Sequence, residues 1–240
     1  MNMEMIKQHP EGDAVRPVRP PKAVIFDMDG TLVDSMPAWH DDGLRYLAKL
    51  GIQGDPALGD ILFTMNSITG AQYLIDTYQL GLTQEEVSAG LSREMEDYYF
   101  HEASWKPGAL ELLEALSRAG VPMGIVTSTD LYCVEAAMDL LNGRRFFQFL
   151  YCASDIGLSK TEPEIFLRAA RALGEDPADT WVVEDGLYAV DVANAAGFTT
   201  VGVYDRISEK DQADLRARSD LYVERLTDLS RAAFVVHEEI

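Results

Sequence analysis

The sequence predicts an α/β fold, in which a parallel sheet carries helices on both faces and a small all-α domain is inserted after the first strand. Three observations lead to this prediction. Short apolar runs recur along the chain and end in polar residues, which is typical of strands buried on both faces of a parallel sheet. Helical patterns alternate with these runs. One long helical stretch interrupts the alternation directly after the first run.

The apolar runs and the helical patterns define the expected elements in order. Each alternating helix has an apolar period and a glycine just beyond its end, which marks a helix terminus. A further helix, containing Cys133, is expected just past Thr127. Right-handed crossovers would place the helices on both faces of the sheet. The expected strands cover 23–26, 122–126, 181–183, 199–203 and 221–223, with a weaker candidate at 149–153, and the helices cover 109–119, 165–173 and 188–196.

Residues 37–105 are expected to form a separate helical domain, because no strand pattern interrupts them. Its helices are expected at 37–50, 57–65, 69–79 and 83–101. The α/β core domain would then consist of residues 23–36 and 106–240. Residues 1–22 are rich in proline and charge and have no apolar period, so we expect them to be a disordered tail.

The composition limits the classes of function. A net charge of −20, from 20 basic and 40 acidic residues, disfavours nucleic acid and anionic lipid as partners, because affinity for phosphate backbones comes mainly from Lys and Arg. Salt screening still allows a small anionic substrate. No apolar run reaches the roughly 18 residues of a membrane span. The 2 cysteines fit a reducing compartment, so we expect a cytoplasmic protein. Monomer and homodimer both remain open.

Polar side chains follow the expected strands at their carboxyl ends, where open parallel sheets bind ligands. Four carboxylates gathered there would repel one another unless a cation lay among them. Oxygen ligands without His or Cys favour Mg²⁺. A hard cation, a lysine and hydroxyl donors together indicate a phosphoryl site. The side chains concerned are Asp27, Asp29, Thr127, Ser128, Glu184 and Asp185, with Lys160 in the loop after the weaker strand candidate.

The run from Phe26 to Ser35, FDMDGTLVDS, resembles the opening motif of the haloacid dehalogenase superfamily. Three later segments resemble its other motifs in the same order, at Thr127-Ser128, at Lys160 and at Glu184-Asp185. Two positions depart from the pattern: Thr161 stands where Pro usually follows the lysine, and Gly186 stands where Ser is often found. The resemblance covers residues 23 to about 225. It implies a Rossmann-like core with a helical cap, in the phosphatase and β-phosphoglucomutase-like branch.

The resemblance also implies a mechanism, a cofactor and a role for each motif residue. The activity would be hydrolysis of a small phosphorylated metabolite through an aspartyl-phosphate, with Mg²⁺ as cofactor. Asp27 would attack phosphorus, and Asp29 would act as general acid and then as general base. Thr127, Ser128, Lys160 and the turn at Gly30 would bind the phosphoryl group, and the metal would be held by Asp27, Asp185, the Asp29 backbone carbonyl and Glu184.

The inserted block limits the substrate, since it has no Lys or Arg between Gly51 and Ser92. This absence disfavours a substrate with a second acidic group and favours a sugar or polyol phosphate or a nucleotide. A β-phosphoglucomutase-like phosphomutase is the alternative, and it would need a cation in the cap for its second phosphate. A non-catalytic regulatory protein is less favoured, because Asp27, Asp29, Lys160 and Asp185 are all retained.

Overall fold

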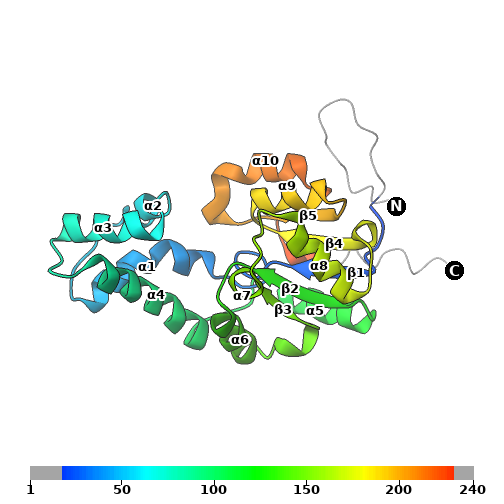
Figure 1. The fold of residues 1–240 in the computed structure, drawn as a ribbon, viewed down its shortest axis with the longest axis horizontal. Coiled ribbons are helices and arrows are strands. Elements are labelled where there is room, and N and C mark those ends of the chain that lie inside the picture. The colour runs from blue at the N-terminus through cyan, green and yellow to red at the C-terminus, as the bar shows by residue number, and fades with distance from the viewer. Residues whose placement is uncertain (1–17, 230–240) are drawn as a thin grey trace. The chain divides into compact units, whose positions relative to one another are not determined.

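The computed structural model describes residues 18–229 (Figure 1). Residues 1–17, which make up most of the predicted tail, and residues 230–240 lie outside the described residues. The chain divides into two compact units. The core unit runs from the N-terminus to Asp34 and resumes at Ser104, and the inserted unit is Ser35–Ala103.

A six-stranded parallel sheet forms the centre of the core unit, in the order β3-β2-β1-β4-β5-β6. The predicted α/β class is therefore confirmed. Three predicted strands, 23–26, 199–203 and 221–223, have the observed bounds, and the other three differ by one residue at each end. The strands are β1 (Ala23–Phe26), β2 (Met123–Thr127), β3 (Leu150–Cys152), β4 (Thr180–Glu184), β5 (Thr199–Val203) and β6 (Leu221–Val223).

Strand β1 is buried on both faces, as its apolar run predicted. Ala23 and Ile25 belong to the hydrophobic cluster that Ile165 and Phe166 of α8 (Pro163–Leu173) also join. Alternate residues of a strand point to opposite faces. Val24, on the other face, is as well buried as Ile25, so both faces of the sheet are covered.

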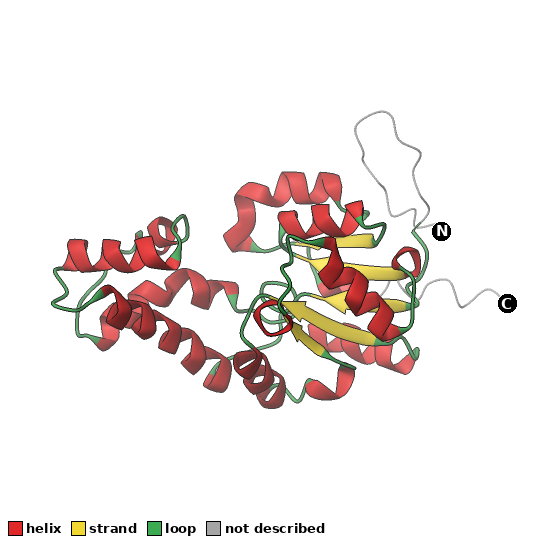
Figure 2. Ribbon diagram, in the orientation of Figure 1, coloured by secondary structure: helices red, strands yellow, loops and turns green. Residues whose placement is uncertain are grey.

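The helices of the core unit flank this sheet (Figure 2). Helix α8 contacts β1 and β2, and α9 (Leu187–Ala195) contacts β4 and β5. The other helices are α5 (Ala109–Arg118), α6 (Leu131–Leu140), which contains Cys133, α7 (Ala153–Ile156) and α10 (Gln212–Arg218). The sequence analysis did not predict α7 or α10, which are both short.

The inserted unit is entirely helical in its regular structure, with its own hydrophobic cluster that includes Leu47, Leu58 and Leu74. Thr83 caps its longest helix through a capping box with Glu86, so each side chain bonds a backbone amide of the first turn. The helices are α1 (Met36–Lys49), α2 (Leu58–Leu62), α3 (Ser67–Tyr78) and α4 (Gln84–His101).

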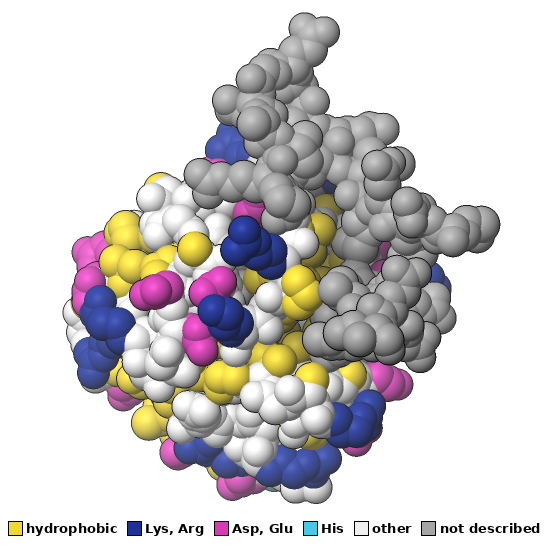
Figure 3. Space-filling model, turned by 90° about the vertical axis from the view of Figure 1, so that its right-hand side faces the viewer, with side chains coloured by type: hydrophobic (Ala, Val, Ile, Leu, Met, Phe, Trp, Pro, Cys, Tyr) yellow, Lys and Arg dark blue, Asp and Glu magenta, His cyan; other side chains and the backbone are white. Residues whose placement is uncertain are grey.

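The last residues of the predicted tail are bound to the core unit. The Trp181 indole donates to the Arg19 carbonyl at 3.0 Å, and the Lys22 ammonium pairs with Asp179 at 2.7 Å. On the face in Figure 3, basic and acidic side chains of the described residues are interspersed. Within residues 18–229, no helix has both the length and the apolar character needed to cross a bilayer.

Candidate active site

The strand order brings the predicted site residues together at the carboxyl edge of the sheet. Strand β1 lies between β2 and β4, so Asp27 after β1 is flanked by Thr127 at the end of β2 and Glu184 at the end of β4. The sequence alone could not establish that these strands are neighbours. All three side chains are buried, with at most 7% of each residue exposed.

Lys160 joins two of these carboxylates. Its ammonium donates to Asp27 Oδ1 at 2.6 Å and forms an ion pair with Glu184 Oε1. Only 4% of Lys160 is exposed. Charge-assisted hydrogen bonds of this kind fix the orientation of both partners. The buried lysine therefore holds Asp27 in one orientation from the loop between α7 and α8.

Burial shapes the electrostatics of this group. Burial raises the pKa of Asp27 to about 8, and the charges of Glu184 and Asp29 add to the rise while Lys160 opposes it. Burial also raises the pKa of Asp185 well above its ordinary value, helped by the charges of Asp27 and Glu184. For Lys160, burial alone would lower the pKa, but Asp27 and Glu184 raise it well above the ordinary value. The carboxylates thus outnumber the positive charge within their reach.

A divalent cation fits this excess of negative charge. Asp27, Glu184 and Asp185 each offer a carboxylate oxygen, and the three oxygens lie within 4.8 Å of one another. A donor set made only of oxygen suits a hard cation such as Mg²⁺. The Thr31 hydroxyl donates to Asp185 Oδ1 at 3.3 Å, which helps to orient that carboxylate.

The Asp29 side chain has a different partner. Its Oδ2 accepts a hydrogen bond of 2.6 Å from the Thr129 hydroxyl, and the residue is half-buried. The sequence analysis did not identify Thr129, although it directly follows the predicted pair Thr127-Ser128. Thr129 therefore holds the carboxylate for which general acid and base chemistry was predicted.

The loop from Asp27 to Val33 closes on itself. The amides of Leu32 and Val33 both donate to the Met28 carbonyl, at 2.9 and 2.8 Å, and the Gly30 amide donates to the Val33 carbonyl at 3.0 Å. Gly30 has a φ of 76°, which explains why glycine stands at this turn. Its own amide is already engaged within the loop, so phosphate binding at Gly30 stays a prediction.

Thr127 and Ser128 present two different environments. Thr127 is buried, and its hydroxyl accepts a hydrogen bond of 3.2 Å from the Thr129 amide. Ser128 is exposed. The phenol of Tyr188 interacts with the Ser128 side chain and with the charges of Lys160, Glu184 and Asp27. Ser128 and Tyr188 thus lie on the solvent side of the buried Asp27–Lys160 ion pair.

Tyr188 is a second residue that the sequence analysis missed. It lies in the first turn of α9, with 51% of the residue exposed. A Cβ at Gly186 would lie 3.1 Å from the Tyr188 ring and 3.2 Å from Glu184 Oε2. The ring therefore takes space that a serine at position 186 would need. In the sequence, this arrangement is indicated by an aromatic residue two positions after Gly186.

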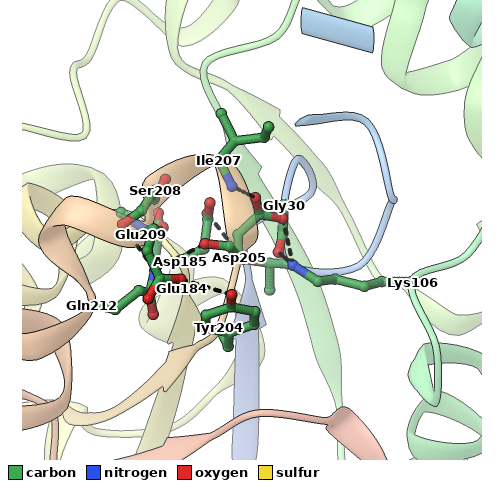
Figure 4. Close-up of polar contacts among 12 residues, drawn as sticks. Gly30, Lys106, Glu184, Asp185, Tyr204, Asp205, Ile207, Ser208, Glu209 and Gln212 are labelled. Atoms are coloured by element: carbon green, nitrogen blue, oxygen red, sulfur yellow. Dashed lines mark hydrogen bonds and ion pairs between the residues drawn. The ribbon is translucent and has the colours of Figure 1, made fainter. Parts of the chain in front are cut away.

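Lys106 and Asp205 form a further, part-buried ion pair beside the site, at 2.7 Å, and Lys106 also donates to the Gly30 carbonyl. Sequence patterns gave no indication of this pair, because the two residues are 99 positions apart. Figure 4 shows the pair together with Glu184 and Asp185.

Comparison with known proteins gives the family. A family model described as haloacid dehalogenase-like hydrolase matches residues 21–197. A solved structure of a HAD family hydrolase from Deinococcus radiodurans R1, with bound phosphate and sodium, superposes with a TM-score of 0.71. It is 24% identical and covers 90% of this chain and 96% of that one, so the likeness concerns the fold.

Three curated relatives differ in their named substrates. The bifunctional riboflavin kinase/FMN phosphatase of Arabidopsis thaliana is 27% identical over 86% of this chain, and the chain spans about half of its length, 54%. Hexitol phosphatase A of Escherichia coli (strain K12) is 29% identical over 76% of this chain and 82% of its own. Phosphoglycolate phosphatase 1 of Pseudomonas aeruginosa is 30% identical over 75% of this chain and 68% of its own length. All three names include a phosphatase activity.

Proposed function

The chain is an enzyme of the haloacid dehalogenase-like hydrolase family, and on this premise we propose that it is a Mg²⁺-dependent phosphomonoester hydrolase. Its substrate would be a small phosphorylated metabolite whose remainder carries no charge, such as a sugar or polyol phosphate or a nucleotide. The observation that carries the proposal is the buried Asp27–Lys160 pair beside Glu184 and Asp185.

In the proposed first half-reaction, a carboxylate oxygen of Asp27 attacks phosphorus. A bond forms between that oxygen and phosphorus while the bond to the leaving alcohol oxygen breaks. Asp29 donates its proton to the leaving oxygen, which departs as an alcohol. The 2.6 Å bond from Thr129 keeps the Asp29 carboxyl in one orientation for this transfer. The product of this half-reaction is an aspartyl-phosphate on Asp27.

In the second half-reaction, the ionised Asp29 takes a proton from water, and the water oxygen attacks phosphorus. The bond between phosphorus and Asp27 breaks, which releases phosphate and restores both carboxyl groups to their starting states. Lys160 orients Asp27 throughout and neutralises part of the charge on the phosphoryl oxygens. Thr127 and Ser128 are proposed to bind those oxygens. A bound Mg²⁺, held by Asp27, Asp185 and the Asp29 carbonyl with Glu184 nearby, would supply positive charge to the phosphoryl group.

Two cations of the inserted unit, Arg45 and Lys49, support a substrate with an uncharged remainder. Arg45 is bonded to Glu102 at 3.1 and 2.5 Å. Lys49 is paired with Glu94 at 2.8 Å and with Asp97 at 2.6 Å. These two cations flank the stretch that has no Lys or Arg, and each is already compensated within its own unit. Neither of these two is left available for a second anionic group of a substrate. Arg93, at the other end of the stretch, donates to the Ala89 carbonyl at 3.1 Å.

The same pairs weigh against a phosphomutase, which must hold a bisphosphate between two reaction steps. They also weigh against phosphoglycolate, although one relative carries that name. Retention of the buried Asp27–Lys160 pair weighs against a purely regulatory protein. The free, buried cysteines Cys133 and Cys152 fit the proposed cytoplasmic location.

The test is a phosphate-release screen with a hexitol phosphate, a hexose phosphate, FMN and phosphoglycolate. Each compound is assayed with Mg²⁺, with EDTA, and with the variant Asp27→Asn. The matched control is Asp179→Asn, which removes a carboxylate of the surface pair with Lys22. We expect release that requires Mg²⁺, survives in the control and is lost in Asp27→Asn.

Two other results would change the conclusion. Preference for phosphoglycolate would contradict the proposed uncharged remainder while leaving the reaction class intact. Transfer of phosphate between the two ester positions of a hexose phosphate, without release, would make the enzyme a mutase. Absence of both reactions would contradict the proposed function.

A further inference from the structure

The segment that leads back into the core unit runs alongside the catalytic loop. Val33 and Trp105 form an antiparallel bridge. The Asp34 amide donates to the Ser104 carbonyl at 3.0 Å, and the Lys106 amide donates to the Leu32 carbonyl at 2.8 Å. All of these residues belong to the core unit. The loop that carries Asp27 and Asp29 is therefore bonded along its second half to residues 104–106.

The Lys106 side chain extends this attachment to the centre of the loop. Its ammonium donates to the Gly30 carbonyl and to Asp205 Oδ2 at 2.7 Å (Figure 4). Only 12% of the Lys106 side chain is exposed. Lys106 thus holds two carbonyls of the loop, that of Leu32 with its amide and that of Gly30 with its ammonium.

Asp205 is itself fixed at the end of β5. Its Oδ1 accepts the Ile207 amide at 2.8 Å, and its carbonyl accepts the Gln212 side-chain amide at 3.3 Å. Gln212 in turn accepts a hydrogen bond of 2.8 Å from Tyr222 of β6. Asp205 is 5% exposed. The carboxylate that holds Lys106 is therefore anchored on two strands of the sheet.

We propose that Lys106 is a positioning residue, which transmits the rigid placement of Asp205 to the Gly30 carbonyl and so fixes the loop that carries Asp27 and Asp29. The inference rests on the proposed function, since it concerns the same reaction. A loop that is not fixed would let the nucleophile and the acid drift from their reacting positions, and displacements of this kind lower kcat without removing the chemical groups.

A competing explanation is that Lys106 only neutralises the buried charge of Asp205. A single variant cannot separate the two explanations, because Lys106→Met would leave Asp205 buried without its partner. The double variant Lys106→Met/Asp205→Asn removes both charges, and the asparagine keeps an oxygen that can accept the Ile207 amide. The double variant therefore abolishes the need for neutralisation but leaves the Gly30 carbonyl without its lysine.

The experiment measures kcat and KM for p-nitrophenyl phosphate at saturating Mg²⁺, with Tm recorded for each variant. The variants are Lys106→Met, Lys106→Met/Asp205→Asn and Lys106→Arg. The matched control is Lys22→Met, which removes a lysine from a surface ion pair of the same unit. We expect the double variant to keep the wild-type Tm while its kcat falls by about tenfold to a hundredfold, with little change in KM. Lys106→Arg should retain more of the activity than Lys106→Met.

Three results would overturn the inference. Wild-type kcat in the folded double variant would reduce Lys106 to a counter-charge. A double variant that does not fold would make Lys106 a requirement of the fold instead of the reaction. Wild-type enzyme that hydrolyses no phosphate ester would overturn the proposed function and this inference together. The first of these results, obtained with an active wild type, would overturn this inference and leave the proposed function intact.

Discussion

Binding of Mg²⁺ should release a proton from Asp27 at neutral pH. Burial raises the pKa of this carboxyl to about 8, so the metal-free side chain holds its proton below that pH. A divalent cation binds the ionised form, and the proton must leave. The apparent affinity should therefore rise by about tenfold per pH unit up to about pH 8, and then level off.

The magnitude follows from the same pKa. Between about pH 6 and about pH 8, a one-proton exchange strengthens Mg²⁺ binding by roughly fiftyfold, or about 2 kcal/mol. Burial raises the pKa of Asp185 well above its ordinary value as well. Calorimetric titration at about pH 7, in two buffers of different ionisation enthalpy, counts the released protons.

The sign of the stability effect follows from the raised pKa. The folded protein keeps a proton on Asp27 that the unfolded chain loses above about pH 4. The stability of the metal-free protein should therefore fall as the pH rises from about 4 to about 8, by at most roughly 6 kcal/mol from this group. Added Mg²⁺ should raise Tm more at pH 8 than at pH 6. A Mg²⁺ affinity that is independent of pH, with no proton released on binding, would refute the reasoning. The control variant Asp179→Asn should behave like the wild type.

Three substitutions test other contacts. Thr129→Val removes the donor to Asp29, so kcat for an alkyl phosphate should fall by about tenfold. The fall should be smaller for p-nitrophenyl phosphate, because its leaving group needs little protonation. Equal losses for both esters would contradict this reasoning. Tyr188→Phe removes a half-exposed phenol at the solvent side of the site and should raise KM by several-fold in steady-state kinetics, whereas unchanged KM would exclude substrate contact. Gly124→Ala would bring a Cβ to 2.3 Å from the Phe149 ring, so thermal unfolding should show a loss of about 1–3 kcal/mol.

The fold was largely predictable because apolar runs are the direct signature of a sheet buried on both faces. Strand β1 is an example, since all four of its residues are buried. The weaker strand candidate at 149–153 corresponds to the shorter β3, Leu150–Cys152. This is an edge strand whose first two residues are only partly buried. Helix α10 was missed because its seven residues, QADLRAR, bury only Gln212 and Leu215 and show little apolar period.

The site was predictable only where its residues stand in local motifs. Thr127 and Glu184 end strands and Asp27 directly follows one, so their convergence followed once the strand order was known. The ion pair between Lys160 and Asp27 joins residues 133 positions apart, and spacing along the chain contains no trace of such a contact. Lys160 was predicted through the motif in which it stands, whereas Lys106 escaped detection because a single lysine in a connecting segment has no pattern of its own.

Charge balance at the site connects the metal with the choice of substrate. Four carboxylates of the core unit, those of Asp27, Glu184, Asp185 and Asp205, are at most 7% exposed. Two ammonium groups, of buried Lys160 and part-buried Lys106, oppose them, which leaves two negative charges in excess when all are ionised. A divalent cation removes this excess, and buried charges without compensation are strongly disfavoured.

With the ion bound, the positive charges of the ion and the two lysines balance the four carboxylates, so the described site has no further cation to offer a substrate. A further acidic group on the substrate would need a cation of its own. In the described inserted unit, Arg45 and Lys49 are already bound to Glu102 and Asp97, and Arg93 donates to the Ala89 carbonyl. The proposed preference for an uncharged remainder therefore follows from the electrostatic balance of the described residues as well as from the absence of basic residues between Gly51 and Ser92.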